Sequence, residues 1–155
     1  MKRLITGILI TLLVLIGISG YALYANHVPW RDPPGFWARM GVYMSQNVAQ
    51  TSSKALFPEL RPRQYDLSAE NLFKRLPDVM ATLGWDIHNI DAEKMELRAV
   101  IQTRWLRFRD DITITTLPLS SSTSTVKISS ASRIGRADYG ANLGHILRFY
   151  TELEQ

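Results

Sequence analysis

The sequence predicts a small α+β domain that follows one N-terminal transmembrane helix. Three features lead to this prediction: an uncharged apolar run near the N-terminus, short segments of alternating apolar residues separated by turns, and two segments with apolar residues at helical spacing. Short hairpin connections require antiparallel neighbours, because parallel strands need long crossovers. The expected domain is therefore an antiparallel sheet of about five strands packed by two helices.

The apolar run Leu4–Tyr24 contains no charged residue. At about 1.5 Å per residue it forms a helix of roughly 31 Å, which is enough to cross a bilayer. Lys2 and Arg3 precede it, so the positive-inside rule places residues 1–3 in the cytoplasm and the remainder outside. The expected location is the cytoplasmic (inner) membrane, single-pass, with a periplasmic domain in a Gram-negative cell. A cleaved signal peptide is the alternative, since it shares the basic start and apolar run.

Residues 25–54 are interpreted as a juxtamembrane amphipathic segment and linker. Asp32 and Pro33 have the residue types of a helix start, and the apolar residues from Phe36 to Val48 then share one face. That face either lies on the membrane or covers the core of the domain. The polar run 50–54 reads as the linker, which places the α+β domain at residues 55–155.

The domain begins with a short strand over residues 63–67 and a helix capped by Ser68 and ended by Gly84. Strands follow over residues 85–90 and 95–101, then around Ile112 and Ile114 and around Val126 and Ile128. A last helix begins near Asp138. The predicted order is strand, helix, four-strand meander, helix.

Composition excludes several classes of function. The formal net charge of +4 includes the two basic residues before the apolar run, and the other charges are of mixed sign, so no nucleic acid partner is expected. The chain has no cysteine, which excludes disulfides and thiolate chemistry. His27, His88 and His145 form no metal-binding motif, so neither a metal nor another cofactor is expected.

Two arginine-rich segments contain the candidate site residues. The first is TRWLRFRDD, residues 103–111, and the second is SASRIGRADYGAN, residues 130–142, which we call the corner. Asp110 lies two residues before Ile112, so the two side chains share a face of the predicted strand. We therefore expect Asp110 to face inward and to need an arginine partner. Asp138 is expected to cap the last helix. The candidates are Arg104, Arg107, Arg109, Asp110, Arg133, Arg136, Asp138 and Asn142.

These segments also carry a family resemblance. Thr103-Arg104-Trp105 with Phe108, Asp110 and Asp111, followed by Ser130–Arg133, Gly135-Arg136, Asp138 and Gly140–Asn142, resembles the bacterial and plastid family called domain of unknown function 1499 (DUF1499). Leu106 departs from the family pattern, because an aromatic residue is common at this position in the family. The resemblance implies a small envelope domain, here in a membrane-anchored member. It brings no established activity, cofactor or catalytic residue.

Two interpretations of the candidates remain open. They form an Arg–Asp network that holds the last helix on the sheet, or they bind an anion such as a lipid headgroup at that helix's N-terminus. A serine hydrolase built from Ser132, Asp138 and His145 lacks the G-x-S-x-G motif, so no catalytic residues are assigned. We therefore expect a non-enzymatic binding or assembly module of the cell envelope. Its candidate partners are the membrane, an anionic lipid or envelope ligand and an envelope protein; an anion-binding protein and a small hydrolase are the alternatives.

Overall fold

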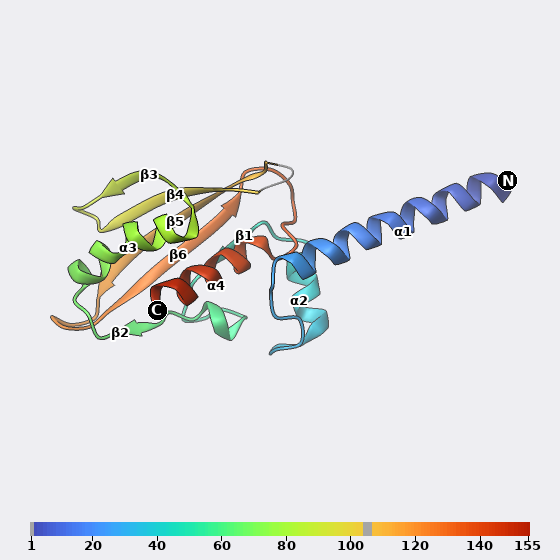
Figure 1. The fold of residues 1–155 in the computed structure, drawn as a ribbon. Coiled ribbons are helices and arrows are strands. Elements are labelled where there is room, and N and C mark those ends of the chain that lie inside the picture. The colour runs from blue at the N-terminus through green and yellow to red at the C-terminus, as the bar shows by residue number, and fades with distance from the viewer. Residues whose placement is uncertain (1, 104–106) are drawn as a thin grey trace.

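The computed structural model describes residues 2–103 and 107–155. The helices are α1 (Lys2–Ala25), α2 (Phe36–Tyr43), the short 3-10 helix η1 (Pro58–Leu60), α3 (Ala69–Leu83) and α4 (Ala141–Leu153). The strands are β1 (Val48–Gln50), β2 (Gln64–Tyr65), β3 (Asp86–Asp91), β4 (Glu96–Gln102), β5 (Arg109–Pro118) and β6 (Ser124–Ser132). Helices α3 and α4 pack on one face of the sheet (Figure 1). The predicted α+β class, with a long apolar helix before it, is confirmed.

The sheet is antiparallel throughout, in the order β1-β6-β5-β4-β3, and β2 pairs with the far end of β6. It has six strands because β1 also joins the sheet. This strand lies where the predicted amphipathic segment meets the predicted linker 50–54, so Val48 is in a strand and not on the expected helical face. Val48 pairs with Ala131, and Thr51 is buried beside Ile128, which donates its N–H to the Thr51 hydroxyl at 2.9 Å. The α+β unit therefore begins before residue 55, and residues 50–54 are not a free linker.

Local signals in the sequence set the ends of α3. The Ser68 hydroxyl accepts a hydrogen bond from the Asn71 N–H at 3.3 Å, as expected of an N-cap. Gly84 ends the helix in the left-handed conformation, with φ of 67°, which glycine adopts without a Cβ clash. Leu72 and Leu76 are fully buried against the sheet, so the predicted helical face is the one that builds the core.

Helix α1 is exposed along most of its length, and it is long and apolar enough to cross a membrane. Its last turn is different, because Leu23 is buried in the core together with Val28. The side-chain amide of Asn26 donates to the Tyr139 carbonyl at 2.9 Å. A Cβ on Gly144 would lie 2.7 Å from the Asn26 carbonyl oxygen. The absence of a side chain at Gly144 thus lets α4 approach the end of α1. We call these contacts the anchor junction.

Candidate functional site

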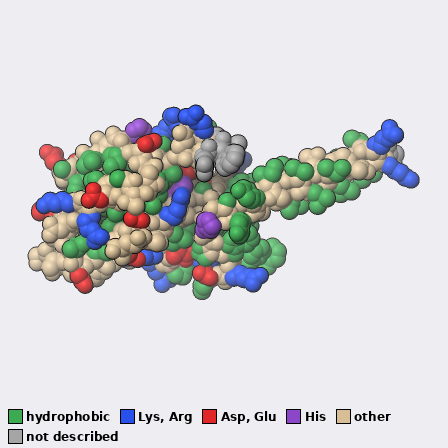
Figure 2. Space-filling view, in the orientation of Figure 1, with side chains coloured by type: hydrophobic (Ala, Val, Ile, Leu, Met, Phe, Trp, Pro, Cys, Tyr) green, Lys and Arg blue, Asp and Glu red, His purple; other side chains and the backbone are tan. Residues whose placement is uncertain are grey.

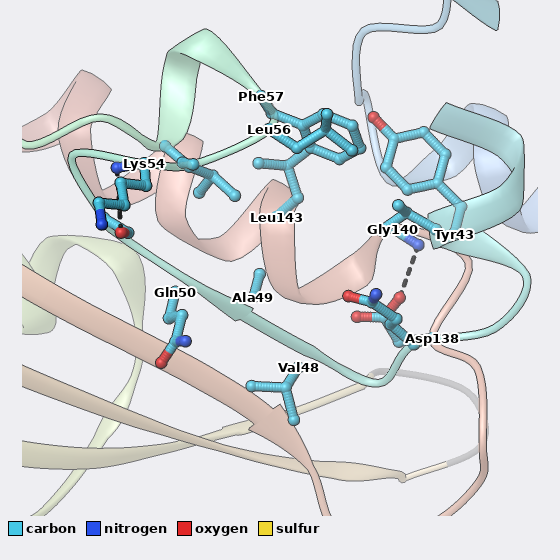
Figure 3. Close-up of a pocket in the computed structure, with 15 residues that line it drawn as sticks. Tyr43, Val48, Ala49, Gln50, Lys54, Leu56, Phe57, Asp138, Gly140 and Leu143 are labelled. Atoms are coloured by element: carbon cyan, nitrogen blue, oxygen red, sulfur yellow. Dashed lines mark hydrogen bonds between the residues drawn. The ribbon is translucent and has the colours of Figure 1, made fainter. Parts of the chain in front are cut away.

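A pocket of about 400 Å³ lies between α2, β1, the segment that leads into η1, and the start of α4 (Figure 3). Its wall is largely apolar and includes Val48, Leu56, Phe57 and Leu143, while Lys54 and Asp138 supply charge. Sites for small molecules have volumes of about 300–1,000 Å³, with apolar walls and a few polar groups. The pocket therefore has the size and lining of a ligand site.

Two apolar side chains of this pocket are left uncovered by the protein. Leu56 is 59% exposed and Val48 is 45% exposed, although both line the hollow. Lys54 and Asp138 lie toward different ends of the pocket (Figure 3). A bound apolar group would remove the two uncovered side chains from water, which is favourable.

A buried arginine holds the α2 wall of the pocket in place. Arg39 is fully buried and donates to both carboxylate oxygens of Glu59, at 2.6 Å and 3.1 Å. It also donates to the carbonyls of Asp32 and Pro33, and its guanidinium lies 4.4 Å from the centre of the Phe57 ring. Burial opposes the charge, but the hydrogen bonds from Arg39 to its partners outweigh it and raise the pKa of this arginine. Helix α2 is thereby joined to η1.

The N-terminus of α4 already holds a carboxylate. Asp138 accepts from the Gly140 N–H at 2.8 Å and from the Asn142 N–H at 3.0 Å. The helix begins at Ala141 with Gly140 as its N-cap, so it starts later than expected, although Asp138 still satisfies free N–H groups there. The buried Asn142 amide links this carboxylate to Ser132 and accepts from the Ser130 hydroxyl. Asp138 thus occupies the position that a bound anion would take at this helix.

The candidate arginines have a different environment from the candidate aspartates. Arg133 forms a two-pronged pair with Asp111, at 2.9 Å and 2.6 Å, in which both side chains are substantially exposed. Arg107, Arg109 and Arg136 are exposed, and Arg104 lies outside the described residues. The structure brings together Asp138 and Asn142 in one hydrogen-bonded network, and it leaves the described arginines of this set on the surface.

Asp110 faces inward as expected, but its partner is a histidine. The Asp110 carboxylate lies 2.9 Å from Nε2 of His145, and Nδ1 of that ring accepts from Arg148 at 2.5 Å. The expectation of an arginine partner for Asp110 is therefore wrong. His145 meets this carboxylate because the second turn of α4 buries its ring under the sheet. Burial alone would raise the pKa of Asp110, but hydrogen bonds from His145 and Ser132 outweigh it and lower the pKa.

This geometry differs from a serine–histidine nucleophile pair. Both ring nitrogens of His145 are engaged, by Asp110 and Arg148, and the Ser132 hydroxyl accepts from Asn142. A hydrolytic serine needs the histidine itself as its hydrogen-bond partner. Among residues 2–103 and 107–155, no hydrogen bond joins Ser132 to His145.

Sequence reasoning missed Arg39, Glu59 and the pocket. One signal was available, because Arg39 lies four residues before Tyr43 and so shares its helical face, an unusual place for a charge. Glu59 carried no such signal. The pocket is assembled from segments far apart in the chain, which no local pattern reveals.

Comparison with known proteins gives one family and several solved structures of low sequence identity. A family model described as a protein of unknown function (DUF1499) matches residues 39–153. No curated protein matches the chain.

Three of the solved structures that are similar to this chain illustrate the low identity. A START superfamily protein from Mycobacterium smegmatis is 8% identical, with a TM-score of 0.47, over 70% of this chain and 94% of that one. Norcoclaurine synthase from Thalictrum flavum is 11% identical, with a TM-score of 0.43, over 77% and 89% of the two chains. The di-domain ARO/CYC protein BexL is 11% identical, with a TM-score of 0.42, over 70% of this chain, which spans 42% of the length of BexL.

Proposed function

The chain belongs to the DUF1499 family, and we propose that it is a non-enzymatic binding module, tethered to the cytoplasmic membrane by α1, whose pocket beside α2 takes the apolar part of a small ligand. The observation that carries this proposal is the pocket itself, in which Leu56 and Val48 line the hollow and yet remain uncovered. A hollow with this lining gains free energy when an apolar group fills it.

The tether is proposed from the length and composition of α1 and from its last turn. Cleavage of a signal peptide near Gly20 or Ala22 would remove or expose Leu23, which is buried in the core of the domain. Loss of a buried leucine costs a folded domain about 2–5 kcal/mol. This favours an uncleaved anchor, and the positive-inside rule then places the domain outside the cytoplasm.

The non-enzymatic part of the proposal is supported by the hydrogen bonds of His145 and of Asp138. His145 is engaged by Asp110 and Arg148, and Asp138 is engaged by the N-terminus of α4. Since that carboxylate fills the helix N-terminus, we do not extend the proposal to an anion site there. The corner instead serves to hold α4 on the sheet.

A saturable-binding experiment tests the pocket. The full chain in lipid nanodiscs is titrated with the fluorescent apolar anion anilinonaphthalene sulfonate, and the signal of empty nanodiscs is subtracted. Leu56→Trp should fill the pocket and remove saturable binding. Leu119→Trp is the matched control, because Leu119 is 55% exposed and lies outside the pocket. Equal binding by both variants, with unchanged melting temperatures, would show that the pocket is not the site.

A further inference from the structure

Helix α2 has a fixed position relative to the end of α1. The Tyr139 backbone joins them, since its carbonyl accepts from the Asn26 amide at 2.9 Å and its N–H donates to the Tyr43 carbonyl at 3.0 Å. The Tyr43 hydroxyl also donates to the Pro29 carbonyl at 2.8 Å. The domain end of α1, the C-terminal end of α2 and the start of α4 therefore meet at one place (Figure 1). The chain cannot move α2 far from the anchor without breaking these bonds.

The two faces of α2 are chemically different. Arg39 and Tyr43 are buried on one face, whereas Trp37 and Met44 are exposed on the opposite face, as a rotation of about 100° per residue requires. Trp37 is 84% exposed, and its ring lies 5.0 Å from that of Phe36, edge to face. Apolar side chains gather on the surface where α1 meets the domain (Figure 2). The domain thus exposes a large aromatic side chain next to its anchor.

From this arrangement we infer that α2 lies on the surface of the bilayer that α1 crosses, with Trp37 among the lipid headgroups. The inference depends on the tether of the proposed function and goes beyond it, because a tether alone would let the domain sit away from the lipid. The path of the chain indicates that lipid covers the exposed face of α2. The polypeptide leaves the bilayer near Ala25, and the anchor junction holds α2 at that level. Tryptophan favours the headgroup region of membranes, and the exposed Arg31 before α2 suits anionic lipid.

Spin labelling tests the inference directly, because the chain has no cysteine of its own. Single cysteines are introduced in the full chain as Trp37→Cys and as Met44→Cys, the second of which keeps both aromatic rings. Leu13→Cys within α1 and Leu119→Cys in the β5–β6 hairpin are the controls. Each labelled protein is placed in nanodiscs of phosphatidylcholine and phosphatidylglycerol. The accessibility of the label to oxygen, which enters lipid, is compared with that to a water-soluble nickel chelate.

The inference expects labels at positions 37 and 44 to have oxygen-to-nickel ratios several-fold above that at position 119 and below that at position 13. Ratios equal to that at position 119 would overturn it, because α2 would then be in water. Labels shielded from both reagents would also overturn it, since protein rather than lipid would cover this face. A low ratio at position 13 would refute the tether and with it the inference, whereas a high ratio there with a low ratio at positions 37 and 44 would refute the inference alone.

Discussion

Replacing the buried arginine of α2 should strongly destabilise the domain. In Arg39→Ala, the Glu59 carboxylate would keep its charge in a site where its side chain is only 16% exposed. The carbonyls of Asp32 and Pro33 would lose their donors, and the Phe57 ring would lose the guanidinium packed on it. All of these groups were ordered by a single side chain.

The expected magnitude follows from burial. Removal of one partner from a buried ion pair costs about 3–5 kcal/mol, because the remaining charge is left uncompensated. The Arg133–Asp111 pair has the same two-pronged geometry, but its side chains are 41% and 50% exposed. Water screens exposed pairs, so Arg133→Ala is a matched control that should leave the free energy of unfolding almost unchanged.

The assay is urea unfolding of the full chain in detergent micelles, followed by tryptophan fluorescence, with melting temperature as a second readout. We expect Arg39→Ala to lower the melting temperature by roughly 10 °C or more and Arg133→Ala to lower it by a few degrees at most. The double variant Arg39→Met, Glu59→Leu should be more stable than Arg39→Met alone, because it removes the orphaned charge. Equal losses in Arg39→Ala and Arg133→Ala would refute the reasoning that burial decides the energy of these pairs.

Three further predictions concern other parts of the domain. Gly144→Ala should destabilise the domain by about 1–3 kcal/mol in the same unfolding assay, since the added Cβ would meet the Asn26 carbonyl. Gly41→Ala is the control: a Cβ there would have nothing within 4 Å, so the substitution should stabilise the domain by up to about 1 kcal/mol. Folding lowers the pKa of Asp110, so its ionised form stabilises the domain above the unfolded-state pKa of about 4, and this stabilisation is lost as the pH falls through the lower folded-state pKa. When urea midpoints are measured from pH 7 to pH 2, Asp110→Asn should lose less stability with falling pH than the unsubstituted protein does. An equal loss in both proteins would contradict this prediction. Tyr150→Phe should leave stability unchanged or raise it, because within the described part of the chain the buried hydroxyl has no hydrogen-bond partner; a loss above about 1 kcal/mol in thermal unfolding would indicate a partner such as bound water.

The parts of the fold that were predictable are those with local signals. Alternation placed Leu97 and Ile112 on the inner face, and Ser68 and Gly84 marked the ends of α3. Strand β1 has no such signal, because it is short and runs into a polar segment. Its partner is β6, far along the chain, so only the completed fold provides the hydrogen bonds that make it a strand.

The candidate site was predictable to the same extent. The inward direction of Asp110 followed from its step with Ile112, but its partner did not, since His145 lies 35 residues away on another element. Asp138 carried a capping signal, whereas the pocket needs α2, β1, η1 and α4 to be packed before it exists. Residue types therefore indicated which groups would be buried, and only tertiary packing decided which groups they would meet.

The anchor junction has a consequence for how the domain would respond to a membrane that α1 crosses. The apolar run of α1 extends about 31 Å, which matches an average hydrocarbon core of roughly 30 Å and exceeds a thinner one. A helix that is longer than the core relieves the mismatch by tilting. A flexible connection would absorb that tilt. Here Leu23 is embedded in the core and Asn26 is bonded to Tyr139, so the domain would rotate with the helix as one body. The thickness of a bilayer would therefore set the tilt of the domain as well as that of α1. The direction in which the pocket opens would then vary with the lipid composition around α1.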